Sequence, residues 1–250
     1  MLTQSILITG CNKGIGLELI CQLAQHPERP QYIFATCRNP DEATDLREIA
    51  TSHEDVYVLQ LDVTDHNSFA RIRDDVSKVV GSAGLNVLFN NAGAFVSNSS
   101  VETLDPKQMM HAYNVNAIAP AMLTKSLLPL LRQASARQSS GSKMSLSRAA
   151  VLNMSSLTGS FADNRSGGMY PSRMARAATN MLTKNLSIEL KKDCILAVAL
   201  NPGWVKTDQG GSNAPWTADY SVGKFLEFLP LLNEEHSGNL YWCDGRLVPW

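Results

Sequence analysis

Short apolar runs alternate along this chain with segments of helical periodicity. Between the first two runs, Ile15, Leu19 and Leu23 recur at four-residue intervals, which is the spacing of one helix face. Segments 108–131 and 173–191 also have a helical pattern. Near-continuous apolar strands between helices are typical of a parallel sheet that is covered on both faces. The predicted strands are 5–9, 32–36, 56–61, 86–90, 149–154 and 195–200.

This alternation predicts the fold class. Strand–helix–strand crossovers are right-handed in nearly all proteins, so repeated units build a doubly wound sheet. We therefore expect an α/β protein with a Rossmann fold and a mostly parallel sheet. Its length of 250 residues suits a single domain over 1–250. We predict that the serine-rich segment 132–148 is a surface loop between a helix and a strand, and not a domain boundary.

Composition and charge exclude several classes of function. A formal net charge of −1 gives no electrostatic reason to expect nucleic acid or an anionic membrane as a partner. The longest apolar runs, such as 127–131, are too short to span a bilayer, and no basic region of a signal peptide opens the chain. Five widely spaced cysteines without a C-x-x-C pair favour reduced thiols in a cytoplasmic protein. The scattered histidines predict no metal site.

A glycine-rich loop, T-G-C-N-K-G-I-G at 9–16, follows the first predicted strand and opens the first predicted helix. Glycines let a backbone turn sharply and approach a pyrophosphate, which then lies at the helix N-terminus. The same glycines could serve only a tight turn, but the strand before and the helix after favour a dinucleotide site. The candidate cofactor-binding residues in this loop are Gly10, Asn12, Lys13, Gly14, Ile15 and Gly16.

The end of the second strand indicates which dinucleotide is bound. Proteins that bind NAD usually place an acid there to hold the ribose 2′-hydroxyl, whereas this chain has Arg38. Lys13 is a second cation that could reach the same region. Two cations favour the 2′-phosphate of NADP through charge-assisted hydrogen bonds, so we expect NADP(H) as the cofactor. The alternative is that both are solvated surface charges.

Further motifs follow in a fixed order: L-D-V at 61–63, N-N-A-G at 90–93, N-V-N at 114–116, N-M-S-S at 153–156 and N-P-G-W-V-K-T at 201–207. With the glycine loop they resemble the motifs of the short-chain dehydrogenase/reductase superfamily over nearly the whole chain. The stretches T-C-R-N-P, D-N-R-S-G-G-M-Y and D-G-R-L-V-P-W are most similar to the sniffer-type carbonyl reductases. The resemblance implies cofactor contacts from Asp62, Val63, Asn91, Ala92, Gly93, Pro202, Gly203, Val205 and Thr207.

The resemblance also implies an activity, the transfer of hydride between NADPH and a small-molecule carbonyl or alcohol. In that family a tyrosine hydroxyl protonates the new alkoxide, and a lysine four residues later lowers the tyrosine pKa and holds the nicotinamide ribose. A serine polarises the carbonyl, and a helix asparagine supports a water chain to the lysine. Ser156 and Asn116 match the serine and the asparagine.

The segment G-G-M-Y-P-S-R-M-A-R-A-A-T-N at 167–180 departs from the family pattern, and two registers compete for it. In the first, Tyr170 is the catalytic tyrosine and Met174 takes the lysine position. In the second, aligned on the helix that follows, Ser172 takes the tyrosine position and Arg176 takes the lysine position. We favour the second register. Tyr170 is then either an aromatic residue at the rim of the substrate pocket or a substitute proton donor.

Two hypotheses follow, because serine is a far weaker acid than a phenol and Arg176 can bind ribose but cannot relay a proton. The chain is either an NADP-dependent oxidoreductase of the carbonyl-reductase kind with a slow or altered proton path, or a catalytically impaired NADP-binding sensor, scaffold or regulatory protein. Segment 207–225 is expected to be the substrate loop, acting as a lid or as a plain surface connection. Many relatives form homodimers through helices at 108–131 and 173–191, and the oligomeric state stays open.

Overall fold

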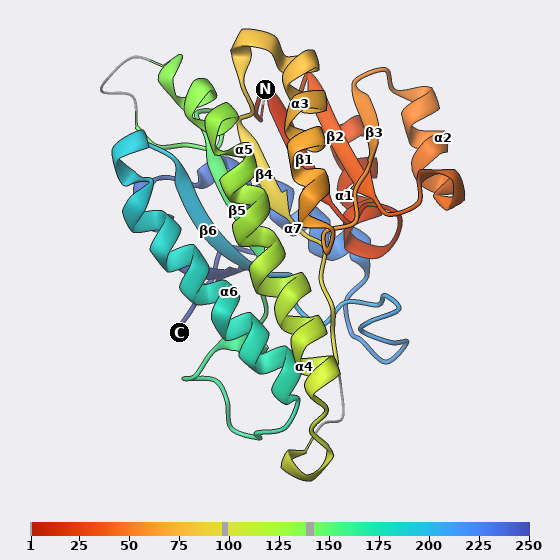
Figure 1. The fold of residues 1–250 in the computed structure, drawn as a ribbon, viewed down its shortest axis with the longest axis vertical. Coiled ribbons are helices and arrows are strands. Elements are labelled where there is room, and N and C mark those ends of the chain that lie inside the picture. Colours follow the sequence, from red (N-terminus) through yellow and green to blue (C-terminus); the bar gives the residue numbers. More distant parts are fainter. Residues whose placement is uncertain (1, 97–99, 139–142) are drawn as a thin grey trace.

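A sheet of eight strands runs through the centre of the molecule, with helices on both of its faces (Figure 1). The computed structural model describes residues 2–96, 100–138 and 143–250. The strand order is β3-β2-β1-β4-β5-β6-β7-β8, and all neighbours are parallel except β7 and β8. The strands are β1 (Ser5–Thr9), β2 (Tyr32–Cys37), β3 (Val56–Gln60), β4 (Val87–Asn90), β5 (Ala150–Met154), β6 (Leu196–Asn201), β7 (Leu240–Trp242) and β8 (Leu247–Val248).

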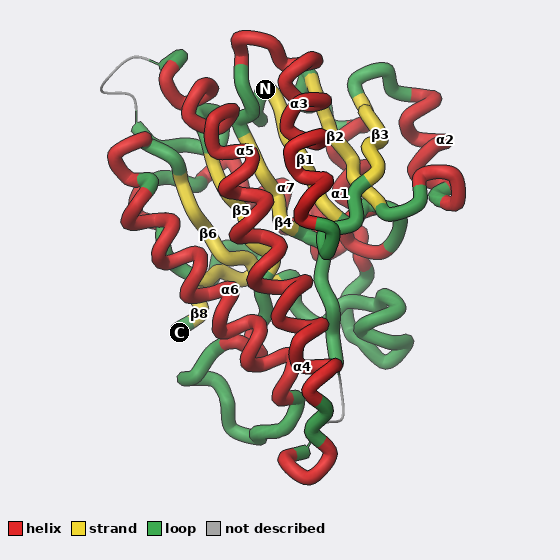
Figure 2. Tube along the Cα trace, in the orientation of Figure 1, coloured by secondary structure: helices red, strands yellow, loops and turns green. Residues whose placement is uncertain are grey.

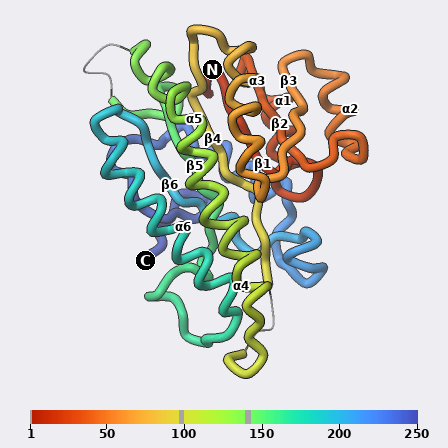
Figure 3. The backbone as a smooth tube through the Cα atoms, in the orientation of Figure 1, coloured from red at the N-terminus to blue at the C-terminus, as the bar shows by residue number. Residues whose placement is uncertain are grey.

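The helices form two layers around this sheet (Figure 2). On one face lie α3, α5 and α6, and on the other lie α1 and α7, as the chain path in Figure 3 also shows. Within the described ranges, no helix is both long and apolar enough to cross a membrane. The helices are α1 (Gly14–Gln25), α2 (Thr44–Ser52), α3 (Phe69–Val80), α4 (Pro106–Tyr113), α5 (Ala119–Ala136), α6 (Tyr170–Glu189) and α7 (Ala218–Phe228).

Strand alternation divides the core between the two helical layers. In β1, Ile6 and Ile8 point to the side of α1 and α7, while Leu7 points to the side of α3 and α5. Leu19 and Leu23 of the predicted first helix are buried against the former side. Each such side chain contributes about 1.5–3 kcal/mol on burial. The doubly wound, mostly parallel sheet predicted from the six apolar runs is confirmed, and β7 and β8 were not predicted.

The long helix predicted at 108–131 is built in three parts. α4 ends at Tyr113, a π-helical turn spans Asn114–Ile118, and α5 continues to Ala136. The first five residues of the predicted serine-rich loop are therefore helical, a correction to its boundaries. The helix continues because Ala134 and Ser135 are buried, and the Ser135 hydroxyl donates to the carbonyl of Asp193 at 2.6 Å. Residues 139–142 of that loop lie outside the described residues.

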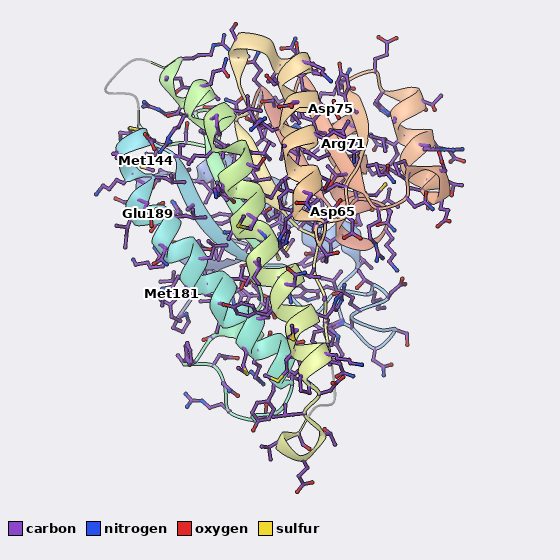
Figure 4. All side chains as sticks on the ribbon, in the orientation of Figure 1. Asp65, Arg71, Asp75, Met144, Met181 and Glu189 are labelled. Carbon is purple, nitrogen blue, oxygen red and sulfur yellow. The ribbon has the colours of Figure 1, made fainter. Side chains whose placement is uncertain are left out.

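The outer side of α6 carries exposed apolar side chains. Met174, Met181 and Ile188 recur at seven-residue intervals, and each is more than half exposed. Figure 4 shows Met181 projecting from this side of the helix. Dimerisation through this helix stays a prediction.

The position of β1 fixes where a ligand can bind. β1 lies between β2 and β4, so the chain builds the sheet outward in opposite directions on its two sides. The loops that leave the carboxyl ends of β1 and β4 therefore diverge over the two faces. In open α/β sheets, ligands bind at this kind of switch point. The glycine loop and the segment 90–93 both lie there.

Candidate functional site

The glycine loop is fixed by the end of β4. The hydroxyl of Thr9 accepts hydrogen bonds from the backbone N–H groups of Asn91 (3.0 Å) and Ala92 (2.9 Å). In return, the Asn91 side chain donates to the carbonyl of Thr9 at 2.8 Å. Gly10 and Gly14 have φ angles of +73° and +57°, which favour glycine. The loop and segment 90–93 are thus one preformed unit.

Gly16 shows how closely this unit is packed. A Cβ atom at Gly16 would overlap the carbonyl oxygen of Gly10 and lie 2.7 Å from Nδ2 of Asn91. Ile15 beside it packs against the core, which fixes the first turn of α1. The side chain of Lys13, the N-cap residue, makes no capping hydrogen bond at the start of α1, so the first N–H groups of the helix are oriented for an anion such as a pyrophosphate.

A hollow of about 380 Å³ lies beside the glycine loop at the end of β2. Asn12 and Arg38 line it together with Asn39, Glu42 and Ala43. Lys13, the second cation that could reach this region, is paired with Asp208 instead. Its Nζ lies 2.5 Å from Oδ2 of Asp208, and both side chains are exposed. Arg38 is therefore the cation that lines this hollow.

Asp62, at the end of β3, is held as a carboxylate. One of its oxygens accepts hydrogen bonds from the N–H (2.8 Å) and the hydroxyl (2.7 Å) of Thr64. Burial acts to raise the pKa of Asp62, but these hydrogen bonds, with the nearby charges of Arg38 and His111, hold it below its usual range. Val63 is half-buried beside it. His111 was not singled out from the sequence.

Arg176 lies at the centre of the site. It is four residues after Ser172, so both side chains leave the same side of α6. Its Nη1 donates to the carbonyl of Met154 at 2.5 Å, and its Nη2 lies 2.5 Å from the place of a Cβ at Gly93. Burial lowers the pKa of Arg176 to about 10, so the guanidinium stays protonated at neutral pH. Met174, the lysine position of the other register, is 53% exposed.

Ser172 and Asn116 both bind the backbone of one short segment. The buried Ser172 hydroxyl accepts from the N–H of Val96 at 2.8 Å and donates to its carbonyl at 2.9 Å. The Asn116 side chain, in the π-helical turn, accepts from the N–H of Ala94 at 2.9 Å and donates to its carbonyl at 2.8 Å. The backbone carbonyl of Asn116 accepts from the hydroxyl of Thr179 at 2.8 Å.

Ser156 begins a 3-10 turn that packs on α6. Its hydroxyl accepts from the N–H of Thr158 at 3.1 Å. The neighbouring Ser155 hydroxyl donates to Oδ1 of Asn180 at 2.5 Å, and Nδ2 of Asn180 donates to the carbonyl of Gly159 at 3.1 Å. Asn180 thereby ties both ends of the turn to α6. Ser155 and Asn180 were not among the site residues predicted from the sequence. Their positions, beside Ser156 and one helical turn after Arg176, were the signals that could have indicated them.

Tyr170 opens α6 and is half-buried. At about 100° per residue, its Cβ leaves the helix about 200° around the axis from that of Ser172. The preceding residue, Met169, has a φ of +47°, so the chain turns sharply into the helix. Tyr170 and the pair Ser172–Arg176 thus start from different sides of the helix.

The chain after β6 crosses from the glycine loop to the end of β4. A methyl carbon of Thr207 lies 3.3 Å from the place of a Cβ at Gly14. Two residues later, Nε2 of Gln209 donates to the carbonyl of Gly93 at 2.7 Å. Gln209 was not singled out from the sequence. The segment therefore covers the edge where the glycine loop and segment 90–93 meet.

Trp216 shapes the start of this crossing segment. Its ring lies where a Cβ of Gly203 would be, and its backbone pairs with Val205 in an isolated parallel bridge. Pro202 before them accepts a hydrogen bond from Ser221 at 2.8 Å. The loop expected over 207–225 is shorter than predicted, because Thr217 caps α7 by accepting from the N–H of Tyr220 at 3.2 Å. Residues 218–225 are therefore helical.

Cys11 lies inside the glycine loop and is fully buried. Its thiol donates to the carbonyl of Ile8 at 3.1 Å, and burial raises its pKa well above the usual range. The thiol is therefore neutral at physiological pH and fills space under the loop.

Comparisons with known proteins identify the family and the fold. The family model for short chain dehydrogenases matches residues 4–218. An uncharacterised oxidoreductase of Schizosaccharomyces pombe is 31% identical over 97% of this chain and 96% of its own. The carbonyl reductase Sniffer of Drosophila melanogaster is 38% identical with a TM-score of 0.97, over 99% of this chain and 100% of its own. The NADPH-bound carbonyl reductase from chicken fatty liver is 37% identical with a TM-score of 0.95, over 99% of this chain and 94% of its own.

The likeness to Sniffer extends over the full sheet and both helical layers, and the family model covers every strand from β1 to β6. The glycine loop, segment 90–93 and the turn at Ser156 follow β1, β4 and β5 within that matched region, at the carboxyl edge of the sheet. Residues 172 and 176, where the favoured register predicts a departure from the family pattern, lie in it too. On this fold and this match, the chain belongs to the short-chain dehydrogenase family of oxidoreductases.

Proposed function

We propose that this protein is an NADP(H)-dependent oxidoreductase of the carbonyl-reductase kind. The observation that carries the proposal is the preformed cradle between β1 and β4, where Gly16 admits no side chain and Asn91 fixes the loop. The hollow lined by Arg38 suits the added phosphate of NADP. Its likeness to carbonyl reductases, one of them with NADPH bound, supports the same assignment.

Each part of the cofactor has a candidate set of residues. In this proposal Asn12 and Arg38 hold the 2′-phosphate, and Arg176 donates hydrogen bonds to the nicotinamide ribose. The bound cofactor supplies the hydride. Asp62 and Val63 are assigned to the adenine. The backbone of the loop residues Gly10, Lys13, Gly14, Ile15 and Gly16 is assigned to the pyrophosphate. The remaining cofactor surface is assigned to Asn91, Ala92, Gly93, Pro202, Gly203, Val205 and Thr207.

The proton path is the part of the site that departs from the family pattern. Ser156 is assigned to the substrate carbonyl, and its turn is fixed on α6 by Asn180. The placement of Arg176 beside Gly93 and Met154, with Met174 exposed, supports the register in which residues 172 and 176 take the tyrosine and lysine positions. The proton for the product then comes from water or from Tyr170. We infer a slow reductase.

A second candidate function is favoured by Ser172. Its hydroxyl proton is engaged with the carbonyl of Val96, so it is a poor donor to a substrate. A catalytically impaired relative that binds NADP(H) as a sensor or scaffold would have this arrangement. Two measurements test both functions: a fluorescence titration with NADPH, and NADPH oxidation with a panel of carbonyl compounds. A failure of NADPH to bind contradicts both functions, and binding without turnover favours the second.

Arg38→Ala is expected to weaken NADPH binding by about 10–100-fold, because a charged hydrogen bond contributes about 1.5–3 kcal/mol. Affinity for NADH, which lacks the 2′-phosphate, should be nearly unchanged. Dissociation constants from the fluorescence titration measure both effects. Arg132→Ala is the control, since Arg132 pairs with Asp193 at the far end of α5. An equal loss of affinity for both cofactors would contradict the assignment of Arg38.

A further inference from the structure

The segment that leaves β4 is bound by side chains at alternate residues. Asn116 satisfies both backbone groups of Ala94, and Ser172 satisfies both backbone groups of Val96. Side chains thus replace the neighbouring strand that would bind an extended segment in a sheet. Both come from positions where the family pattern places catalytic groups. Asn116 and Ser172 form what we call the backbone clamp.

Ser172 suits this role better than the donation of a proton. A hydroxyl has one proton and two lone pairs. In the structure the proton is directed to the carbonyl of Val96, and one lone pair accepts its N–H. To donate to a substrate, the hydroxyl would have to break its hydrogen bond to the carbonyl of Val96. Ser172 is also only 1% exposed, which keeps a substrate away from it. A side chain that extends beyond this hydroxyl, such as tyrosine, would have to displace the backbone of Val96.

The clamp is connected to the cofactor cradle through Gly93. Gly93 directly precedes the clamped segment, and the place of a Cβ at Gly93 lies 2.5 Å from Nη2 of Arg176 and 3.3 Å from Oδ1 of Asn116. Its carbonyl also accepts the hydrogen bond from Gln209. A shift of Val96 would therefore be transmitted to the place where α6 meets the end of β4.

We propose that Ser172 is a positioning residue, which locks the segment Ala94–Val96 onto the first turn of α6 and so holds Gly93 in place against Arg176. The link to cofactor affinity rests on the proposed NADP(H) function. The hydrogen bonds that hold the segment do not depend on that function, so this part of the proposal can be tested in the protein without cofactor.

The test compares Ser172→Ala with the wild type by amide hydrogen exchange of peptides that contain Gly93–Val96. The variant leaves the N–H and carbonyl of Val96 without the serine, so exchange there should be at least about tenfold faster, which corresponds to about 1.4 kcal/mol. The dissociation constant for NADPH should rise by a similar factor. Ser172→Thr keeps the hydroxyl and should restore both values towards the wild type.

A matched control removes a different hydroxyl from the same helix. Thr183 is fully buried in α6 and accepts a hydrogen bond from Asn153 at 2.9 Å. Thr183→Val should lower overall stability but leave the relative exchange of Gly93–Val96 unchanged. If Ser172→Ala does not fold, Ser172→Cys, which keeps the volume and weakens the hydrogen bonds, serves in its place and should show an intermediate increase.

Each outcome decides one part of the proposal. Unchanged exchange at Gly93–Val96 in Ser172→Ala, or an equal increase in Thr183→Val, would show that Ser172 does not lock the segment. Faster exchange with unaltered NADPH affinity would overturn the link to Arg176. If the wild type does not bind NADPH, the proposed function fails, while the exchange measurement still decides the lock.

Discussion

The double variant Ser172→Tyr/Arg176→Lys is expected to reduce carbonyl compounds about 10²–10⁴-fold faster than the wild type at saturating NADPH. That range is the usual contribution of a positioned general acid, which the wild type lacks at residue 172. Lysine at 176 supplies the cation that lowers the tyrosine pKa. The dissociation constant for NADPH should rise at the same time, since tyrosine cannot replace both hydrogen bonds of Ser172 to Val96. The turnover number and the cofactor affinity should therefore change in opposite senses.

The decisive measurement is the turnover number across a carbonyl panel, with Tyr170→Phe as the control. Tyr170 starts from another side of α6, so its hydroxyl is expected to matter little in the double variant, where the tyrosine at 172 supplies the proton. An unaltered rate in the double variant would show that residue 172 does not face the reacting carbonyl. A fast wild type that loses its activity in Tyr170→Phe would show that Tyr170 is the proton donor, and that the other register is correct.

Gly16→Ala is expected to lose about 10²–10⁴-fold in NADPH affinity. The added Cβ would overlap the carbonyl of Gly10, so the loop must shift away from segment 90–93. Two charged hydrogen bonds from the loop to the pyrophosphate, at about 1.5–3 kcal/mol each, account for this range. Overpacking should also lower the free energy of unfolding by about 1–3 kcal/mol. Titration with NADPH and thermal unfolding measure the two effects.

Gly223→Ala provides the matched control for this variant. Gly223 lies in α7, and the nearest atom to an added Cβ is Oε1 of Gln22 at 3.9 Å. This replacement should leave NADPH affinity unchanged and stabilise the helix by up to about 1 kcal/mol. If Gly16→Ala behaves like Gly223→Ala, the loop is not packed as the structure describes it.

The hydrophobic periodicity of the sequence was sufficient to predict most of the strands and helices. The six predicted strands were recognisable because a strand that is covered on both faces of the sheet is apolar at nearly every position. The last two strands, β7 and β8, have only three and two residues, too few to show a pattern. The π-helical turn at Asn114–Ile118 was not predicted either, since its residues fit an ordinary helical pattern.

For the site, motifs predicted which residues lie together but not which atoms they bind. Gly10, Gly16 and Asn91 meet because the fold brings the ends of β1 and β4 side by side. The partner of Lys13 is 195 residues away at Asp208, and nothing near Lys13 in the sequence indicates it. The contact of Ser172 with Val96 depends on a backbone path that no motif specifies.

Cys11 offers a chemical reporter for the loop that surrounds it. Because its thiol is buried and its pKa is raised, an alkylating reagent can react with it only when the loop opens far enough to expose the sulfur. The rate of Cys11 labelling, followed by mass spectrometry, therefore measures how often the glycine loop opens. A dinucleotide that fills the cradle should slow this labelling, which gives a binding assay that needs neither turnover nor cofactor fluorescence.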